Sequence, residues 1–223
     1  MNFSMLLKPF ICFLFIMIVG CSNLTRPTDP KDMTISIHDD STYVETFDEL
    51  GLGKLLDFHL KLPDADKRWV ELWVEAYRDG DEEPQRLITL SYGLNPEPFA
   101  EGNIGFGMIE IVHETPLLFL YSPTGKVQSK SLGLTSPPTK PSAWDYAIGN
   151  EEVVLALGET QLLGVYRESK DNMIRMYPLQ DETGLKQMIQ DHSLVLLLKI
   201  KVEDGDENIP PKASTSVDTY FQL

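Results

Sequence analysis

The chain has 223 residues, with 34 Asp and Glu against 19 Lys and Arg, and its formal net charge is −15. Nucleic acid binding needs a basic stripe that displaces counterions from phosphates, so this balance excludes nucleic acid as an expected partner. Only two Cys are present, which excludes a disulfide-rich scaffold and leaves a hydrophobic core to hold the fold.

The first twenty residues combine one positive charge, Lys8, with an apolar run from Phe10 to Val19. A helix needs about 20 apolar residues to cross a bilayer, so this run is short for a span but has the length of a signal-peptide core. An uncleaved N-terminal anchor is the alternative that the run leaves open.

The run ends on Ile18-Val19-Gly20-Cys21. This tetrapeptide, behind a charged start and an apolar core, resembles the lipobox of bacterial lipoprotein precursors. The resemblance implies that the Cys21 thiol receives a diacylglycerol and that signal peptidase II cuts before it. Cys12 is then discarded with residues 1–20, which argues against a Cys12–Cys21 disulfide.

Residues 21–223 carry 18 Lys and Arg against 34 Asp and Glu, a net charge of −16. Such a chain is not attracted to anionic lipid headgroups, so the membrane is expected as a partner only through the N-terminal lipid. Two acyl chains give stable anchoring where one gives marginal binding. We therefore expect a lipid-anchored protein on the extracytoplasmic face of the cell membrane.

Four segments follow from composition: a lipoprotein signal peptide (1–20), a flexible tether (21–33), a β-rich extracytoplasmic domain (34–203) and a loosely ordered tail (204–223). The tether and the tail are polar and contain prolines, without apolar periodicity. Residues 34–203 are long enough for one sizeable core or for two small subdomains.

Most of this domain has the two-residue period of strands. Residues 55–62 alternate apolar and polar side chains. Residues 194–202 keep one face apolar throughout, and their other face begins apolar and ends charged, which predicts a strand that starts buried on both sides. Residues 152–157 and 162–166 predict a hairpin, residues 172–177 a short strand, and the phase switch beside Gly105 and Gly107 a β-bulge.

Helical signals are few. Residues 182–191 space Leu185, Met188 and Ile189 as one short helix. Residues 65–78 fit either a helix or a strand, and the β-branched and aromatic content favours the strand. The predicted fold is mostly β: an antiparallel β-sandwich or barrel-like sandwich with one short helix. The layout resembles small lipoproteins of Gram-positive bacteria, a resemblance that implies no particular activity.

Five residues form a candidate ligand platform if residues 65–78 are a strand, because their side chains then share one face: Trp69, Glu71, Trp73, Glu75 and Tyr77. Rings on a sheet face can stack on sugars or hold a peptide, and carboxylates can orient it. The alternative is that the rings belong to a second packing layer.

Two acidic turns, residues 78–84 and 203–210, follow long apolar strands. Asp79, Asp81, Asp204 and Asp206 offer oxygens that suit calcium, but Asp-Gly is also common hairpin chemistry, and the turn interpretation is favoured. No metal and no cofactor is expected, because phosphate-loop, nucleophile-elbow and zinc motifs are missing from the sequence.

The glycines of Asn103-Ile104-Gly105-Phe106-Gly107 leave a bare strip of backbone that a ligand or another strand could approach, if they do not mark a bulge. The expected function is a non-catalytic binding or envelope-accessory module, with an envelope glycan or a protein as partner. One alternative is an enzyme acting on an envelope polymer with a carboxylate acid/base pair. Glu71 and Glu75 would lie on the order of 13 Å apart on a strand, too far for that chemistry. A structural or assembly protein is the other alternative.

Overall fold

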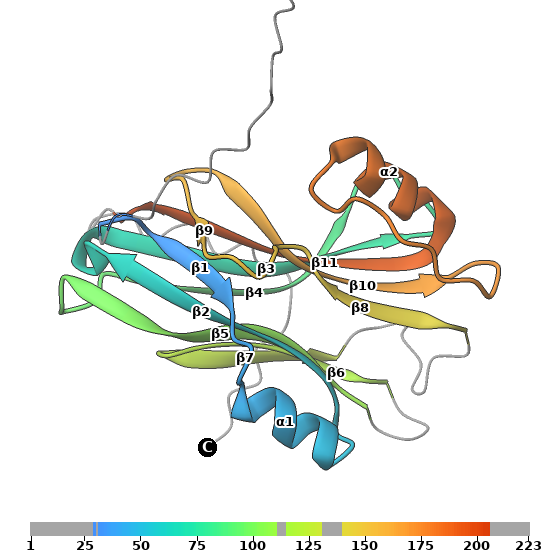
Figure 1. The fold of residues 1–223 in the computed structure, drawn as a ribbon, viewed down its shortest axis with the longest axis horizontal. Helices are drawn as coiled ribbons and strands as arrows, with labels where there is room; N and C mark the ends of the chain where they lie inside the picture. Colours follow the sequence, from blue (N-terminus) through green and yellow to red (C-terminus); the bar gives the residue numbers. More distant parts are fainter. Residues whose placement is uncertain (1–28, 30, 111–114, 131–139, 206–223) are drawn as a thin grey trace, which may run out of the picture.

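The computed structural model describes residues 29, 31–110, 115–130 and 140–205, and it shows two antiparallel sheets packed face to face (Figure 1). The six-stranded sheet has the order β7-β6-β5-β2-β1-β9, and the five-stranded sheet has the order β4-β3-β11-β10-β8. The predicted β-sandwich is therefore confirmed.

The elements are, in chain order, β1 (Thr34–Ile37), α1 (Thr42–Glu49), β2 (Gly53–Pro63), a 3-10 turn (Ala65–Lys67), β3 (Arg68–Arg78), β4 (Gln85–Gly93), β5 (Phe99–Ile109), β6 (Leu117–Ser122), β7 (Gly125–Lys130), β8 (Ser142–Tyr146), β9 (Val153–Val154), β10 (Thr160–Ser169), α2 (Glu182–Asp191) and β11 (His192–Asp204). The first strand begins at Thr34, and the last ends at Asp204.

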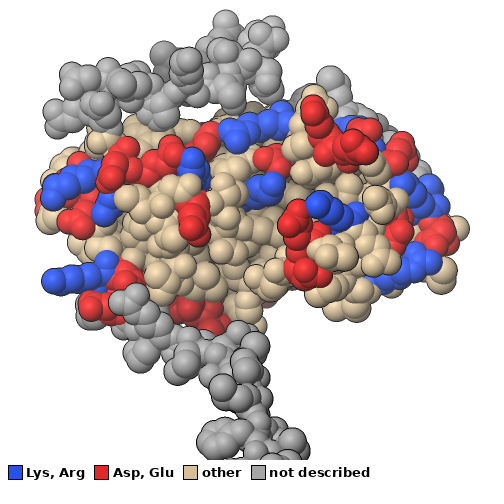
Figure 2. Space-filling model, turned by 90° about the horizontal axis from the view of Figure 1, so that it is seen from above, with Lys and Arg blue, Asp and Glu red and all other residues tan. Residues whose placement is uncertain are grey.

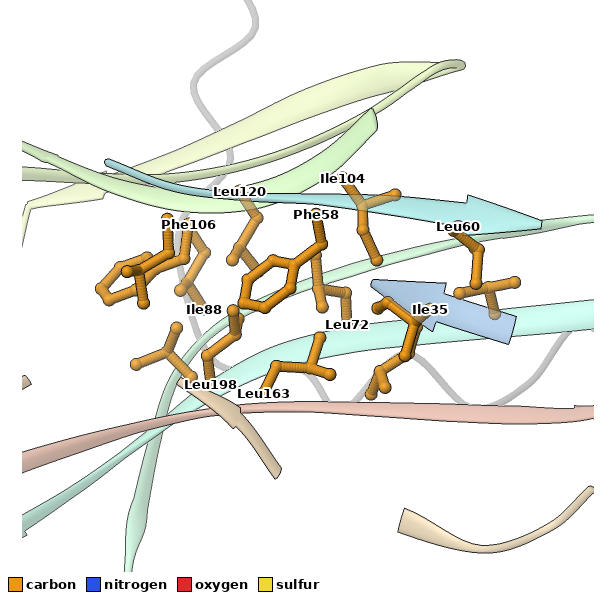
Figure 3. Packing of buried hydrophobic residues seen from close by; sticks show 14 of the residues in the cluster. Ile35, Phe58, Leu60, Leu72, Ile88, Ile104, Phe106, Leu120, Leu163 and Leu198 are labelled. Carbon is orange, nitrogen blue, oxygen red and sulfur yellow. The ribbon is translucent and has the colours of Figure 1, made fainter. Parts of the chain in front are cut away.

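One hydrophobic core fills the space between the sheets. Figure 3 shows side chains of the two layers pointing toward one another, among them Phe58 and Ile104 from the six-stranded sheet and Leu72, Leu163 and Leu198 from the five-stranded sheet. All five are fully buried. Because this single cluster joins strands from β1 to β11, the described strands form one sandwich.

Periodicity predicted the long strands correctly. Residues 55–62 lie in β2, which pairs along its whole length with β5. Residues 65–78, left open between helix and strand, form the 3-10 turn and β3. Residues 194–202 lie in β11, at the centre of the five-stranded sheet, and Val195 and Leu197 are fully buried on its outer side.

Two helices cover the outer faces of the sandwich, α1 beside the six-stranded sheet and α2 beside the five-stranded sheet (Figure 1). The helix at residues 182–191 was predicted, and its Met188 and Ile189 pack onto the outer side of β11. Helix α1 was not predicted, so the expectation of a single helix is wrong for the described chain. Its eight residues are too short to give a periodic signal, although Ser41 is a regular N-cap.

Three local predictions are wrong. β5 pairs with β2 and β6 without a register shift, so Gly105 and Gly107 do not mark a bulge. β9 and β10 do not form a hairpin, because β9 pairs with β1 in one sheet and β10 with β8 and β11 in the other. Residues 172–177 form an irregular segment, in which Met173, Ile174 and Met176 are exposed.

The lipobox-like residues Ile18–Cys21, most of the predicted tether, and the tail beyond Gly205 lie outside the described residues. Within the described ranges, no helix has the length and apolar character that a membrane crossing requires.

Candidate functional site

The five residues of the predicted platform do share one side of β3. Their neighbours Val70, Leu72, Val74 and Ala76 alternate with them and are buried in the sandwich core. The side chains of Trp69, Glu71, Trp73, Glu75 and Tyr77 therefore lie on the opposite side, as strand geometry requires. Their surroundings differ from one end of the strand to the other.

Trp73, at the centre of this face, is buried, and only 4% of its surface is exposed. The Arg86 guanidinium lies 4.5 Å from the centroid of the Trp73 ring, within cation–π range. The indole Nε1 donates to Glu75 Oε1 at 2.7 Å. A ligand cannot stack on a ring that is covered in this way.

Both glutamates of the platform form ion pairs with side chains of neighbouring strands. Arg86 Nη1 lies 2.6 Å from Glu71 Oε1, and Lys199 Nζ lies 2.6 Å from Glu75 Oε2. The two carboxylates thus complete an ion-paired layer over Trp73. On the face seen in Figure 2, acidic and basic side chains likewise lie side by side.

Tyr77, at one end of the platform, packs against the apolar cluster under α2. Burial raises its pKa, and the nearby Glu75 charge adds to the effect. Its ring therefore belongs to a second packing layer.

Trp69, at the other end of the platform, lines a cavity of about 280 Å³. The cavity wall also includes Leu62, Ala65, Tyr92, Gly93, Leu94, Asn95, Pro96, Ala100 and Thr124. A side chain at position 93 would collide with Trp69, because a Cβ there would lie 2.9 Å from the ring atom Cε3. Glycine at this position thus lets the indole ring lie close to β4.

Two polar atoms of this wall have no hydrogen-bond partner among the described residues, Trp69 Nε1 and the Tyr92 hydroxyl. Burial raises the pKa of Tyr92, so the hydroxyl stays protonated. A buried unpaired donor costs about 1–3 kcal/mol. Trp69 and its cavity are therefore the part of the predicted platform that suits binding.

The acidic turns have ordinary structural roles where the structure describes them. Asp79 and Gly80 both adopt positive φ between β3 and β4, as a tight hairpin turn requires. Asp204 forms an ion pair with Arg68, and Asp206 lies outside the described residues. Asp81 is exposed in the same turn as Asp79. Among the described residues, no group of three or more His, Cys, Asp and Glu side chains could hold a metal ion.

A polar cluster that sequence reasoning missed surrounds Asp57, on the outer side of β2. Asp57 is fully buried, and its carboxyl group accepts from Tyr121 Oη at 2.5 Å, from Asn103 Nδ2 at 3.2 Å and from Ser41 Oγ. His38 Nδ1 lies 2.9 Å from the same carboxyl group. These donors replace the water that a buried acid loses.

Two glycines on β5 leave the space that the aromatic rings beside this cluster occupy. A Cβ at Gly105 would lie 2.4 Å from the Tyr121 hydroxyl, and a Cβ at Gly107 would lie 2.2 Å from Phe119 Cζ. The two rings of β6 therefore occupy the bare strip that the glycines leave. The strip is filled by the chain's own aromatic residues and is not open to a ligand.

The Asp57 cluster also attaches α1 to the sheet. Ser41 caps the helix by accepting from Val44 N at 3.2 Å, and its hydroxyl donates to Asp57. The Tyr43 and Tyr121 rings meet edge to face, with centroids 5.9 Å apart. The cluster is thus a structural joint, and its carboxyl group is closed to a substrate by these contacts.

The only signal in the sequence for this joint was a lone acid between Leu56 and Phe58 of an apolar strand. His38 and Ser41 lie between β1 and α1, and the other partners lie in β5 and β6, so no local pattern connects them. The two-residue period places Asp57 on the polar side of β2, and the tertiary contacts of Ser41, α1 and β6 bury it there.

No protein-family model matches the chain, and neither a curated protein nor a solved structure matches it. Its fold is that of an antiparallel β-sandwich protein. Because sandwiches host many unrelated functions, the function has to be argued from the residues.

Proposed function

We propose that this chain is a membrane-anchored lipoprotein whose β-sandwich is a non-catalytic binding or envelope-accessory module on the extracytoplasmic face. The observation that carries the proposal is Ile18-Val19-Gly20-Cys21 behind an apolar core of signal-peptide length. The net charge of −16 after residue 20 supports attachment through lipid on Cys21, since the acidic surface has no attraction for anionic headgroups.

The arrangement of the carboxyl groups supports binding over catalysis. Glycoside hydrolysis needs two carboxyl groups about 5–9.5 Å apart that reach the substrate. Glu71 and Glu75 are ion-paired with Arg86 and Lys199, and Asp57 is buried among hydrogen-bond donors. An enzyme acting on an envelope polymer therefore has less support among the described residues.

Binding is best supported at the Trp69 cavity, where the rings of Trp69 and Tyr92 and an apolar wall meet. Aromatic rings supply contact area to sugars and peptides. An envelope glycan or a protein segment is the ligand class that this wall suits.

The anchor is tested by labelling cells with an alkyne analogue of palmitate and following the protein in membrane and soluble fractions. Cys21→Ala is expected to abolish the label and to leave an unprocessed precursor. Cys12→Ala is the matched control, because it removes the other thiol of the chain, and it is expected to keep the label. Normal processing and labelling of Cys21→Ala would contradict the proposal.

The binding role is tested by sedimentation of the full chain with purified cell-wall glycan. Trp69→Ala is expected to lower the bound fraction, whereas Phe99→Ala, which removes an exposed aromatic ring outside the cavity wall, is expected to leave it unchanged. Equal binding by both variants would place the site elsewhere. Release of soluble fragments from the glycan would instead favour the enzyme.

A further inference from the structure

A second cavity, of about 290 Å³, lies beside β8, the edge strand of the five-stranded sheet. It is lined by the end of β8 and the residues after it (145–149), by Arg167 of β10, and by the segment that leads to α2 (176, 177, 179 and 180), and it is open to solvent on one side. These elements lie in the right half of Figure 1. The cavity is separate from the Trp69 wall and shares no lining residue with it.

Arg167 gives this cavity a buried cation, because its side chain is only 2% exposed. One terminal nitrogen of the guanidinium group is paired with Asp145, and the other donates to the Arg175 carbonyl oxygen at 3.2 Å. Nε has no acceptor among the described residues. A guanidinium group is always charged, and because both terminal nitrogens of Arg167 are paired, Nε is the donor left for one carboxylate oxygen.

The rest of the wall is largely apolar. Ile148 and Leu179 contribute aliphatic side chains, and Tyr177 contributes a ring whose centroid lies 6.0 Å from the Arg167 guanidinium carbon. Met176 is 85% exposed at this site, and an unbranched thioether side chain can fold over ligands of different shape. Gln180 closes one part of the wall by donating to the Ala147 carbonyl oxygen.

We propose that this cavity binds a small aliphatic monocarboxylate, with its carboxylate on Arg167 and its hydrocarbon chain against Ile148, Leu179 and Met176. One water occupies about 30 Å³ in the liquid, so the cavity takes about ten non-hydrogen atoms. Asp145 pairs with Arg167 in the same wall and repels any anion, so a dianion such as phosphate is repelled more strongly than a monocarboxylate. The inference goes beyond the proposed function, because it assigns a second class of ligand to a cavity separate from the one that Trp69 lines.

The test is calorimetric titration of the full chain in a non-ionic detergent with sodium hexanoate. Hexylammonium has the same chain with the opposite charge, and acetate has the carboxylate without the chain. Hexanoate is expected to saturate one site with a millimolar Kd, acetate to bind at least about tenfold more weakly because each buried methylene contributes, and hexylammonium to give no saturable signal.

Gly149→Leu is the variant that tests the location, because Gly149 lines the cavity, a leucine there is expected to narrow it, and the Arg167–Asp145 pair is unchanged. A Cβ at Gly149 meets no atom within 4 Å, and neither does a Cβ at Gly125, which is the first residue of β7. Gly149→Leu is expected to weaken hexanoate binding at least tenfold, and Gly125→Leu to bind as the wild type does.

Three results would overturn the inference: no saturable hexanoate binding, equal binding of hexylammonium, or unchanged binding by Gly149→Leu. Each of these leaves the acyl labelling of Cys21 and the glycan sedimentation by Trp69→Ala as they are. A failure of the carboxylate site is therefore distinguishable from a failure of the proposed lipoprotein function.

Discussion

The Tyr121 hydroxyl donates to the Asp57 carboxyl group at 2.5 Å, and the ring reaches across the bare backbone of Gly105 to do so. β2, β5 and β6 are adjacent strands, and Asp57, Gly105 and Tyr121 stand opposite one another in the ladder. Burial raises the pKa of Tyr121, and the hydrogen bond to Asp57 raises it further, so the phenol keeps its proton and acts as the donor.

Tyr121→Phe is expected to destabilise the protein by about 1–3 kcal/mol, because it removes a donor from a buried carboxyl group. Urea unfolding measures the change in the free energy of unfolding. Tyr43→Phe is the matched control, since Tyr43 is half exposed and touches the same cluster through its ring. Equal effects of the two variants would mean that the Tyr121–Asp57 hydrogen bond contributes nothing.

Gly105→Ala is expected to cost about 1–3 kcal/mol through overpacking. Its Cβ would lie 2.3 Å from the Leu56 carbonyl oxygen and 2.4 Å from the Tyr121 hydroxyl, so the ring has to move away from Asp57. Thermal unfolding followed by circular dichroism detects the loss. Gly149→Ala, where a Cβ meets no atom within 4 Å, should leave the melting temperature nearly unchanged.

Tyr92→Phe is expected to leave stability unchanged or to raise it by about 1 kcal/mol, because it removes a buried hydroxyl that has no partner among the described residues. Tyr166→Phe should lower the free energy of unfolding, since the Tyr166 hydroxyl donates to Glu168 Oε1 at 2.7 Å. Denaturant unfolding of both variants checks the difference. A clear loss of stability in Tyr92→Phe would show that its hydroxyl makes a stabilising contact.

His192 is expected to make stability fall as the pH drops below about 6.5. Burial lowers its pKa in the folded state, so the unfolded chain binds the proton more readily. The stability is therefore fully present above the unfolded pKa and is lost as the pH falls through the range below it, with a slope of up to about 1.4 kcal/mol per pH unit.

Unfolding curves between pH 7.5 and 5.5 measure that slope. His192→Gln is expected to flatten it, even though the loss of the hydrogen bond between His192 Nδ1 and the Met188 carbonyl oxygen lowers stability at every pH. An unchanged slope in the variant would exclude His192 as the titrating group.

The sequence by itself determined what depends on local periodicity and on chain chemistry. The alternation in residues 55–62 and 194–202 predicted β2 and β11, because a half-buried strand has to present apolar side chains at every second position. The two apolar faces at the start of β11 correctly predicted that this part of the strand is buried on both sides, and α2 covers its outer side. The acidic balance and the lipobox-like Cys21 likewise come from sequence alone, and the lipid anchor stays a prediction.

Only the tertiary structure decided which strands pair and which polar groups become buried. Val153 and Thr160 begin strands of different sheets, although a turn signal lies between them, because β9 finds its partner in β1. Asp57 and Trp73 occupy positions that alternation assigns to the surface, yet α1 covers the first and Arg86 the second. The burial of these two side chains depends on contacts between residues far apart in the chain. The alternation of apolar and polar positions along one strand carries no information about such contacts.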